Sequence, residues 1–168
     1  MNKTILLAVD AAQHVQAAAD MTRELSRDTG DQVVVLHVHE FAVGRFGRIR
    51  VDCADGEGEQ LVAGLVKDLR AEGITAEGDI REAGFGHISR RILEIADDYD
   101  ARIIVLGARG RHDLPHLPLG SVSHRLLHAA HRPVLIVPRP TAQPATARDE
   151  PARQEKAVRT AGAVAATE

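Results

Sequence analysis

Two kinds of apolar segment alternate along the first 138 residues, and this alternation constrains the fold more than any other feature. Short runs such as TILLAVD at 4–10 are almost wholly apolar, as expected for strands buried on both faces of a sheet. The segments between them place apolar residues at helical spacing, for example Leu61, Leu65 and Leu69. Units that alternate in this way predict an α/β domain with a doubly wound parallel sheet and helices on both of its faces.

The boundaries of the expected elements follow from the same pattern. Residues 41–56 contain glycines and arginines without clear periodicity, and we expect them to form a loop. The polar run at 75–83 and the proline-bracketed PVLIVP at 133–138 suit edges of the sheet. Ligands of such sheets bind beyond the carboxyl ends of the strands, so functional residues are expected there. The expected strands cover 4–10, 32–40, 75–83, 101–107 and 133–138, and the expected helices cover 11–29, 57–72, 86–99 and 121–131.

Composition narrows the classes of function. The formal charge of −3 gives the chain no overall positive charge with which to attract nucleic acid, and an aromatic content of 2% argues against a surface on which bases could stack. We therefore expect no nucleic-acid partner. Cys53 is the only cysteine, which excludes an intrachain disulfide and cysteine-rich zinc modules. The N-terminal apolar run is too short for a signal peptide, and no run reaches the roughly 20 residues of a membrane span. We therefore expect a cytoplasmic protein without a membrane partner.

The composition changes after the last apolar run. Residues 140–168 are rich in Ala, Thr, Pro, Arg and Glu, which is typical of a flexible tail that builds no core. We therefore expect one folded domain over 1–139, followed by this tail.

The glycine-rich segment LGARGRHDLPHLPLGSVSH at 106–124 is the candidate functional motif. Gly107 and Gly110 end a buried strand, and Gly120 precedes an expected helix whose first N–H groups have no partner within the helix. These N–H groups and the helix dipole favour an anion such as phosphate. Side chains offered to the same volume are the hydroxyls of Ser121 and Ser123 and the guanidinium groups of Arg109 and Arg111.

The residues alone leave a second interpretation open, a long surface loop with Ser121 as an ordinary helix N-cap. Two well-known phosphate motifs are absent from the chain. No Gly-Lys pair occurs, which excludes a Walker loop, and no G-x-G-x-x-G follows the first strand.

The spacing G-x2-G-x9-G-S, after IIVLG and before RPVLIVP, resembles that of the universal stress protein family, and within it the ATP-binding branch. The resemblance extends over residues 2–138. It implies a Rossmann-like domain with a five-stranded sheet of order 3-2-1-4-5. It also implies a stress-response regulator that binds ATP and forms a homodimer through the Pro133–Pro138 edge strand, with a protein partner that the sequence does not name.

The same resemblance implies the positions of the nucleotide contacts. Asp10 would contact ribose or adenine, the main chain of Val38 would meet the adenine, and a magnesium or manganese ion would bridge the phosphates without a metal site of the protein's own. The implied nucleotide-binding residues, with the side chains noted above, are Ala8, Val9, Asp10, Val38, Gly107, Ala108, Arg109, Gly110, Arg111, Gly120, Ser121, Val122 and Ser123.

Several of these features also have purely structural interpretations. Asp10 and Gln13 resemble a capping box, and Ala12 stands where the family often has a serine. His124, His128 and His131 share one helix face, which we interpret as solvated rather than metal-binding. His37 and His39 share one face of the second strand, where we favour packed histidines; the alternative is that His39, near the strand end, borders the adenine pocket. Arg45, Arg48 and Arg50 predict a solvated mobile loop, with a phosphate lid or a docking patch as alternatives.

No set of residues in the sequence assembles a catalytic centre. Ser121 and Ser123 lack a G-x-S-x-G elbow, and no residue stands out as a base for water. We therefore expect at most slow ATP hydrolysis. The alternatives are a slow adenine-nucleotide hydrolase or nucleotidyl-transfer protein, and a dimeric stress protein that binds no nucleotide.

Overall fold

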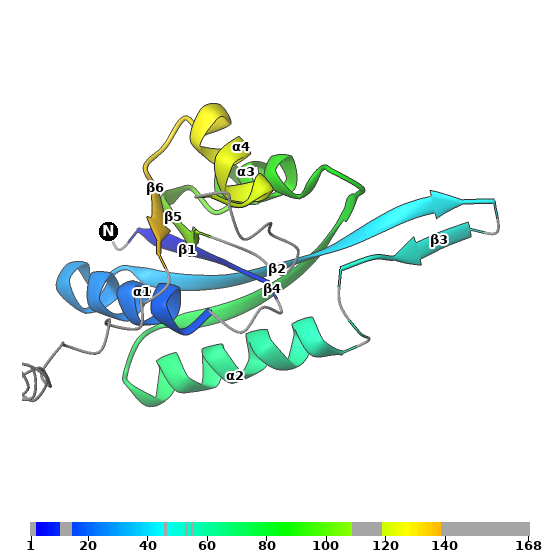
Figure 1. Ribbon diagram of the computed structural model, residues 1–168. Coiled ribbons are helices and arrows are strands. Elements are labelled where there is room, and N and C mark those ends of the chain that lie inside the picture. Colours follow the sequence, from blue (N-terminus) through cyan, green and yellow to red (C-terminus); the bar gives the residue numbers. More distant parts are fainter. Residues whose placement is uncertain are drawn as a thin grey trace, which may run out of the picture.

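The computed structural model describes residues 3–10, 15–45, 47–52, 54, 56–108 and 119–138. A central sheet is covered by α1 and α2 on one face and by α3 and α4 on the other, as Figure 1 shows. In chain order the elements are β1 (Thr4–Val9), α1 (Val15–Thr29), β2 (Gln32–Gly44), β3 (Gly47–Arg50), α2 (Glu57–Ala71), β4 (Ala76–Gly84), α3 (Ile88–Asp98), β5 (Ala101–Gly107), α4 (Ser121–Ala129) and β6 (Val134–Val137).

Five of the strands form the expected parallel sheet. Their order is β4-β2-β1-β5-β6, which is 3-2-1-4-5 when only the parallel strands are counted. The doubly wound α/β fold is thus confirmed, and the predicted order holds for the parallel strands; the sheet differs from the prediction by a sixth strand, β3, which pairs antiparallel with β2. Within the described part of the chain, β4 pairs only with β2 and β6 only with β5, so both lie at edges as their sequences indicated.

The central strands are buried on both faces, which explains their unbroken apolar runs. Ile5 and Val33 belong to the core beneath α1 and α2. The next residue along each strand, Leu6 and Val34, belongs to the core beneath α3 and α4. Burial of each such side chain contributes roughly 1.5–3 kcal/mol. Gly30 follows the end of α1 and Gly73 lies two residues beyond the end of α2, and both have the left-handed conformation that glycine adopts without strain.

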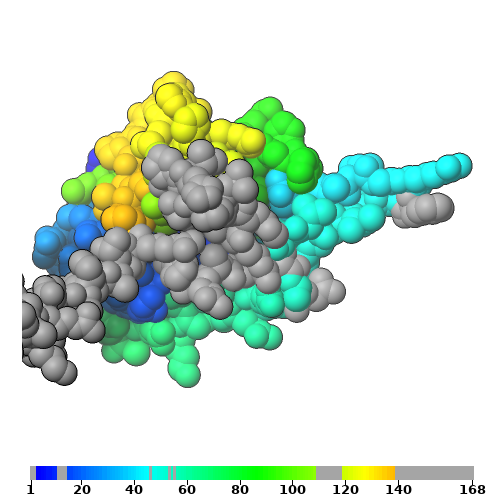
Figure 2. All heavy atoms as spheres, in the orientation of Figure 1, coloured from blue at the N-terminus to red at the C-terminus, as the bar shows by residue number. Residues whose placement is uncertain are grey.

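The expectation of a loop over 41–56 is wrong for residues 41–50, whereas the described residues between Arg50 and Glu57 belong to no helix or strand. β2 continues to Gly44, and β3 returns antiparallel to it with Phe41 opposite Arg50. This hairpin extends away from the rest of the molecule (Figures 1 and 2). Val43 and Ile49 are 85% and 59% exposed, so no core imposes an alternating pattern on the segment. The missing periodicity reflects the absence of a buried face, and the strands form nevertheless.

Cation–π contacts and an ion pair hold the hairpin in shape. The Arg48 guanidinium lies 4.5 Å from the centroid of the Phe41 ring and pairs with Glu82 of β4 at 2.6 Å. Arg50 lies 5.7 Å from the same ring centroid. Arg48 and Arg50 therefore belong to an ordered hairpin, and the expectation of a mobile loop at these arginines is corrected. None of the described helices is both long and apolar enough to cross a bilayer.

Candidate functional site

The carboxyl edges of β2, β1 and β5 bring the predicted nucleotide residues into one row. Val9 lies opposite His37 and Ala8 lies opposite Leu106 in the strand registers. One step further along, Asp10 therefore lies beside Val38 on one side and beside the end of β5 on the other. Three segments that are far apart in the sequence thus converge at the edge where doubly wound sheets bind ligands.

The start of α4 is joined directly to the end of β5. The Gly120 N–H donates to the Ala108 carbonyl at 2.8 Å, and the Ser123 hydroxyl donates to the Gly107 carbonyl at 3.0 Å. On the other side, the Ala108 N–H donates to the Val137 carbonyl of β6 at 2.8 Å. The two ends of the glycine-rich segment therefore lie side by side at the carboxyl end of β5, and the N-terminus of α4 lies at the same edge of the sheet.

The predicted residues differ in what they offer to a ligand. Ser123 is buried, and its hydroxyl hydrogen is used in the bond to Gly107, so its side chain acts first as a link between α4 and β5. Ser121 is exposed at the first position of α4, where backbone N–H groups lack acceptors within the helix. Gly120 is extended, at φ −71° and ψ 161°, a conformation open to other residues.

Some predictions fall on residues that the structure does not describe. Arg109, Gly110 and Arg111 lie outside the described residues, and so do Ala12 and Gln13. The capping box at the start of the first helix is therefore not tested.

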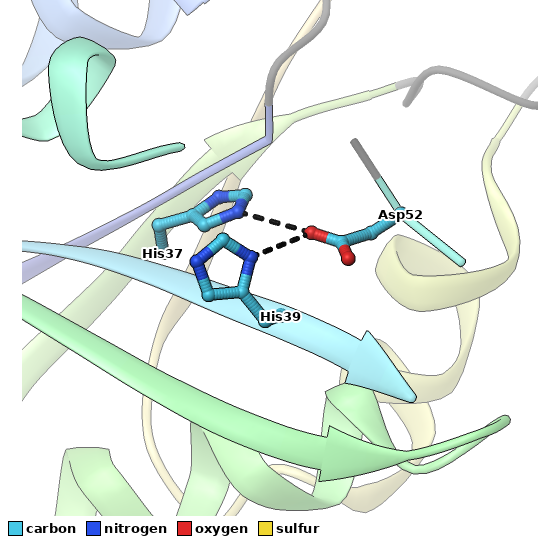
Figure 3. A group of neighbouring side chains, drawn as sticks. All are labelled: His37, His39 and Asp52. Carbon is cyan, nitrogen blue, oxygen red and sulfur yellow. Dashed lines mark hydrogen bonds and ion pairs between the residues drawn. The ribbon is translucent and has the colours of Figure 1, made fainter. Parts of the chain in front are cut away.

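A second group of polar side chains lies beneath this edge, on the face of β2 that α2 covers. His37 and His39 are each 2% exposed, which confirms that both are packed. Their rings meet edge to face with centroids 4.7 Å apart. Asp52, which follows β3, points its Oδ2 toward both rings, 3.3 Å from His37 Nε2 and 2.9 Å from His39 Nδ1 (Figure 3).

The second nitrogen of each histidine has its own oxygen partner. His37 Nδ1 lies 2.9 Å from the Val9 carbonyl oxygen, and His39 Nε2 lies 3.0 Å from Glu59 Oε1 of α2. A hydrogen bond from its own backbone N–H, and after it the bond with His39, lowers the pKa of Glu59 from its usual value. Glu59 is therefore an ionised acceptor at neutral pH.

Gly58 allows α2 to approach these histidines. A Cβ at this position would overlap the His37 ring. The close approach places the neighbouring Glu59 against His39. The sequence analysis paired the two histidines correctly on one strand face, but it did not connect them with Asp52. The sequence did not predict β3, which pairs antiparallel with β2 and so brings Asp52 back beside the histidines of β2.

The remaining histidines of the described chain do not form such a group. His124 and His128 are exposed on α4 with ring centroids 4.7 Å apart, His131 follows the end of that helix, and His87 is exposed at the start of α3. Their interpretation as a solvated face is confirmed for the two helical members. Among the described residues, only His37, His39 and Asp52 bring three possible ligand atoms within 4.8 Å of one another.

Comparison with known proteins adds the family to this geometry. The model of the universal stress protein family matches residues 1–138. A universal stress protein of Thermus aquaticus is 32% identical over 142 residues, which cover 82% of this chain and 99% of the relative. The solved structure of MJ0577 from Methanocaldococcus jannaschii superposes with a TM-score of 0.67 at 22% identity, over 84% of this chain and 99% of that chain.

A further neighbour carries a nucleotide. It is a universal stress protein from Archaeoglobus fulgidus in complex with dAMP, with a TM-score of 0.58 and 21% identity, over 82% of this chain and 98% of that one. Both solved structures share the fold of this chain. The chain belongs to the universal stress protein family.

Proposed function

We propose that this protein is an ATP-binding regulator of the stress response, which acts through nucleotide-dependent binding to other proteins. The observation that carries the proposal is the junction of Gly107 and Ala108 with the start of α4, beside Asp10. It gathers backbone donors and a helix N-terminus at the ligand-binding edge of the sheet.

The adenosine end of the ligand fits the β1–β2 side of this edge. Asp10 offers carboxylate oxygens to ribose hydroxyls or to the adenine amino group, and Val38 offers backbone groups to the base. The dAMP-bound neighbour from Archaeoglobus fulgidus supports an adenine nucleotide as the ligand class.

The phosphate end fits the β5–α4 side. The N–H groups at the start of α4 and its dipole favour negative charge there. Arg109, Gly110 and Arg111 follow Ala108 in the sequence, and we propose that they contact the phosphates. A magnesium or manganese ion would be held by the phosphate oxygens, because these hard cations prefer oxygen ligands.

The proposal assigns no dedicated chemistry to the bound ATP. We propose that the protein is cytoplasmic, with a folded domain over 1–139 followed by a tail over 140–168, and that it binds a protein partner. Contacts between the nucleotide and the glycine-rich segment would change the surface that such a partner meets.

A homodimer completes the proposal. β6 is a half-buried edge strand, with β5 as its only partner strand in the described chain. Pairing with the same strand of a second copy would satisfy its outward N–H and C=O groups. We propose that this antiparallel pairing forms the dimer.

A thermal-shift titration of the full chain with ATP, ADP, AMP and GTP, with and without Mg²⁺, tests the nucleotide site. Binding raises the free energy of unfolding by about 2.7 kcal/mol at a hundred times the dissociation constant. We expect ATP with Mg²⁺ to give the largest shift and GTP the smallest. If no adenine nucleotide moves the midpoint at millimolar concentration, the proposal is wrong.

The matched variants are Gly120→Val and Gly64→Val. Val at position 120 crowds the start of α4 where the phosphates would lie, and we expect it to abolish the ATP shift. Gly64 lies in α2, where an added Cβ meets nothing within 4 Å, so Gly64→Val should keep the shift. Equal shifts in both variants would contradict the placement of the phosphates.

A further inference from the structure

The buried polar group on β2 is not used by the proposed nucleotide site. We call His37, His39 and Asp52 the His–Asp cluster. The two histidine side chains extend from β2 and the Asp52 side chain from the segment after β3, and the three point toward one another (Figure 3). Both rings are almost completely buried, and the Asp52 side chain is 13% exposed. Burial of so many polar atoms is costly unless each one has a suitable partner.

Hydrogen positions in the cluster are constrained by its oxygen partners. A backbone carbonyl only accepts hydrogen bonds, so His37 must carry its hydrogen on Nδ1, toward Val9. In the neutral ring this leaves a lone pair on Nε2, directed at Asp52 Oδ2. In the tautomer that donates from Nε2 to Glu59, the neutral ring of His39 has a lone pair on Nδ1 directed at the same oxygen. Two nitrogen lone pairs and a carboxylate oxygen therefore converge, which is the donor set of a cation site.

The outer partners match those of metal-bound histidines. A histidine that binds a metal usually donates its other ring N–H to a backbone carbonyl or a carboxylate, which fixes the ring and raises its basicity. Here the Val9 carbonyl has this role for His37, and Glu59 has it for His39, at 2.9 and 3.0 Å. Gly58 fixes the His37 ring further, since α2 packs directly against it.

The distances suit a small ion. Ligand atoms bound tetrahedrally to Zn²⁺ at about 2.0–2.1 Å lie roughly 3.3 Å apart. His37 Nε2 and His39 Nδ1 lie 3.3 and 2.9 Å from Asp52 Oδ2, and all three atoms lie within 4.8 Å of one another. The two ring nitrogens and the carboxylate oxygen are therefore close enough together to bind one small ion.

We propose that the His–Asp cluster binds one divalent transition-metal ion, with Zn²⁺ as the preferred ion. Two imidazole ligands favour Zn²⁺, Co²⁺ or Ni²⁺ over Mg²⁺, which takes oxygen ligands. The site is separate from the magnesium or manganese ion that nucleotide phosphates would hold. The bound ion links Asp52, which follows β3, to the two histidines of β2. Through His37 it also fixes the position of the Val9 carbonyl, next to Asp10.

The test is metal binding by the full chain after removal of metals with a chelator. Co²⁺ is titrated first, because its visible absorption reports the coordination geometry, and Zn²⁺ then competes for the site. We expect one equivalent of Zn²⁺ to displace Co²⁺ and to raise the thermal midpoint of the nucleotide-free protein. Element analysis gives the stoichiometry. A separate nucleotide titration of the metal-free protein tests the nucleotide site alone, so failure of one proposal can be distinguished from failure of the other.

Ligand variants are chosen to preserve the fold. His39→Gln and Asp52→Asn keep similar shapes, and we expect each to abolish stoichiometric binding while far-UV circular dichroism is unchanged. Glu59→Ala removes only an outer partner, so it should weaken binding by about 10–100-fold. The paired control His124→Gln/His128→Gln removes two exposed histidines, and Cys53→Ser removes the only thiol; both should bind Zn²⁺ as the unmodified protein does.

Two results would overturn the proposal. Either His39→Gln and Asp52→Asn retain one equivalent of Zn²⁺, or the unmodified protein binds neither Zn²⁺ nor Co²⁺ at micromolar concentration. In the second case the cluster is a network of proton-bridged hydrogen bonds only.

Discussion

At the scale of single residues, Gly58 determines how closely α2 approaches the histidines of β2. The absence of a Cβ lets the first turn of the helix lie against the His37 ring, and the same approach brings Glu59 to His39. A glycine inside a helix costs roughly 0.5–1 kcal/mol relative to alanine. At this position the cost is offset by contacts that no larger residue permits.

We therefore predict opposite effects for two glycine substitutions in α2. Gly58→Ala should lower the free energy of unfolding by about 1–3 kcal/mol, because the added methyl group displaces the His37 ring. Gly64→Ala lies in open space and should raise it by up to about 1 kcal/mol. Urea unfolding followed by circular dichroism measures both. Equal stabilisation by the two substitutions would mean that α2 does not contact His37 as described.

At the scale of elements, the β2–β3 hairpin differs from the rest of the sheet. Its outer part, residues 41–50, extends beyond the helices (Figure 1), and Val43 and Ile49 are mostly exposed. Its contacts with the body include the Arg48–Glu82 ion pair and the chain that continues to Asp52. The hairpin thus adds little apolar burial, and its importance to the fold is the position that it gives Asp52.

Substitutions in the hairpin should consequently cost much less than substitutions beneath α4. We expect Val43→Ser/Ile49→Ser to change the free energy of unfolding by less than about 1 kcal/mol. Leu126→Ala, at a fully buried position of α4, should cost about 2–5 kcal/mol. Chemical denaturation compares the two, and a large loss in the double variant would show that the hairpin packs against another surface in solution.

At the scale of the whole molecule, β6 offers one open edge for assembly. Pro133 and Val137 direct carbonyl groups toward β5, so the backbone groups of Val134 and Ile136 point outward along the parallel ladder. An edge of this kind invites pairing with a second strand.

We predict a dimer at micromolar concentration in sedimentation velocity. Val134→Pro removes one outward N–H and leaves the inward ladder to β5 intact, so we expect it to weaken the dimer while the secondary structure is retained. A monomeric unmodified protein would contradict the proposed assembly. A dimer that is unaffected by Val134→Pro would move the interface to another surface.

The sequence by itself determined the parallel sheet, both of its edges and the position of the glycine-rich segment. It did so because strands buried on both faces leave unbroken apolar runs, as in TILLAVD, and because helices leave a different spacing between them. Only the tertiary structure decided the hairpin over 41–50 and the His–Asp cluster. An exposed hairpin imposes no hydrophobic pattern on its residues, and the contact of Asp52 with His37 and His39 depends on where that hairpin returns the chain.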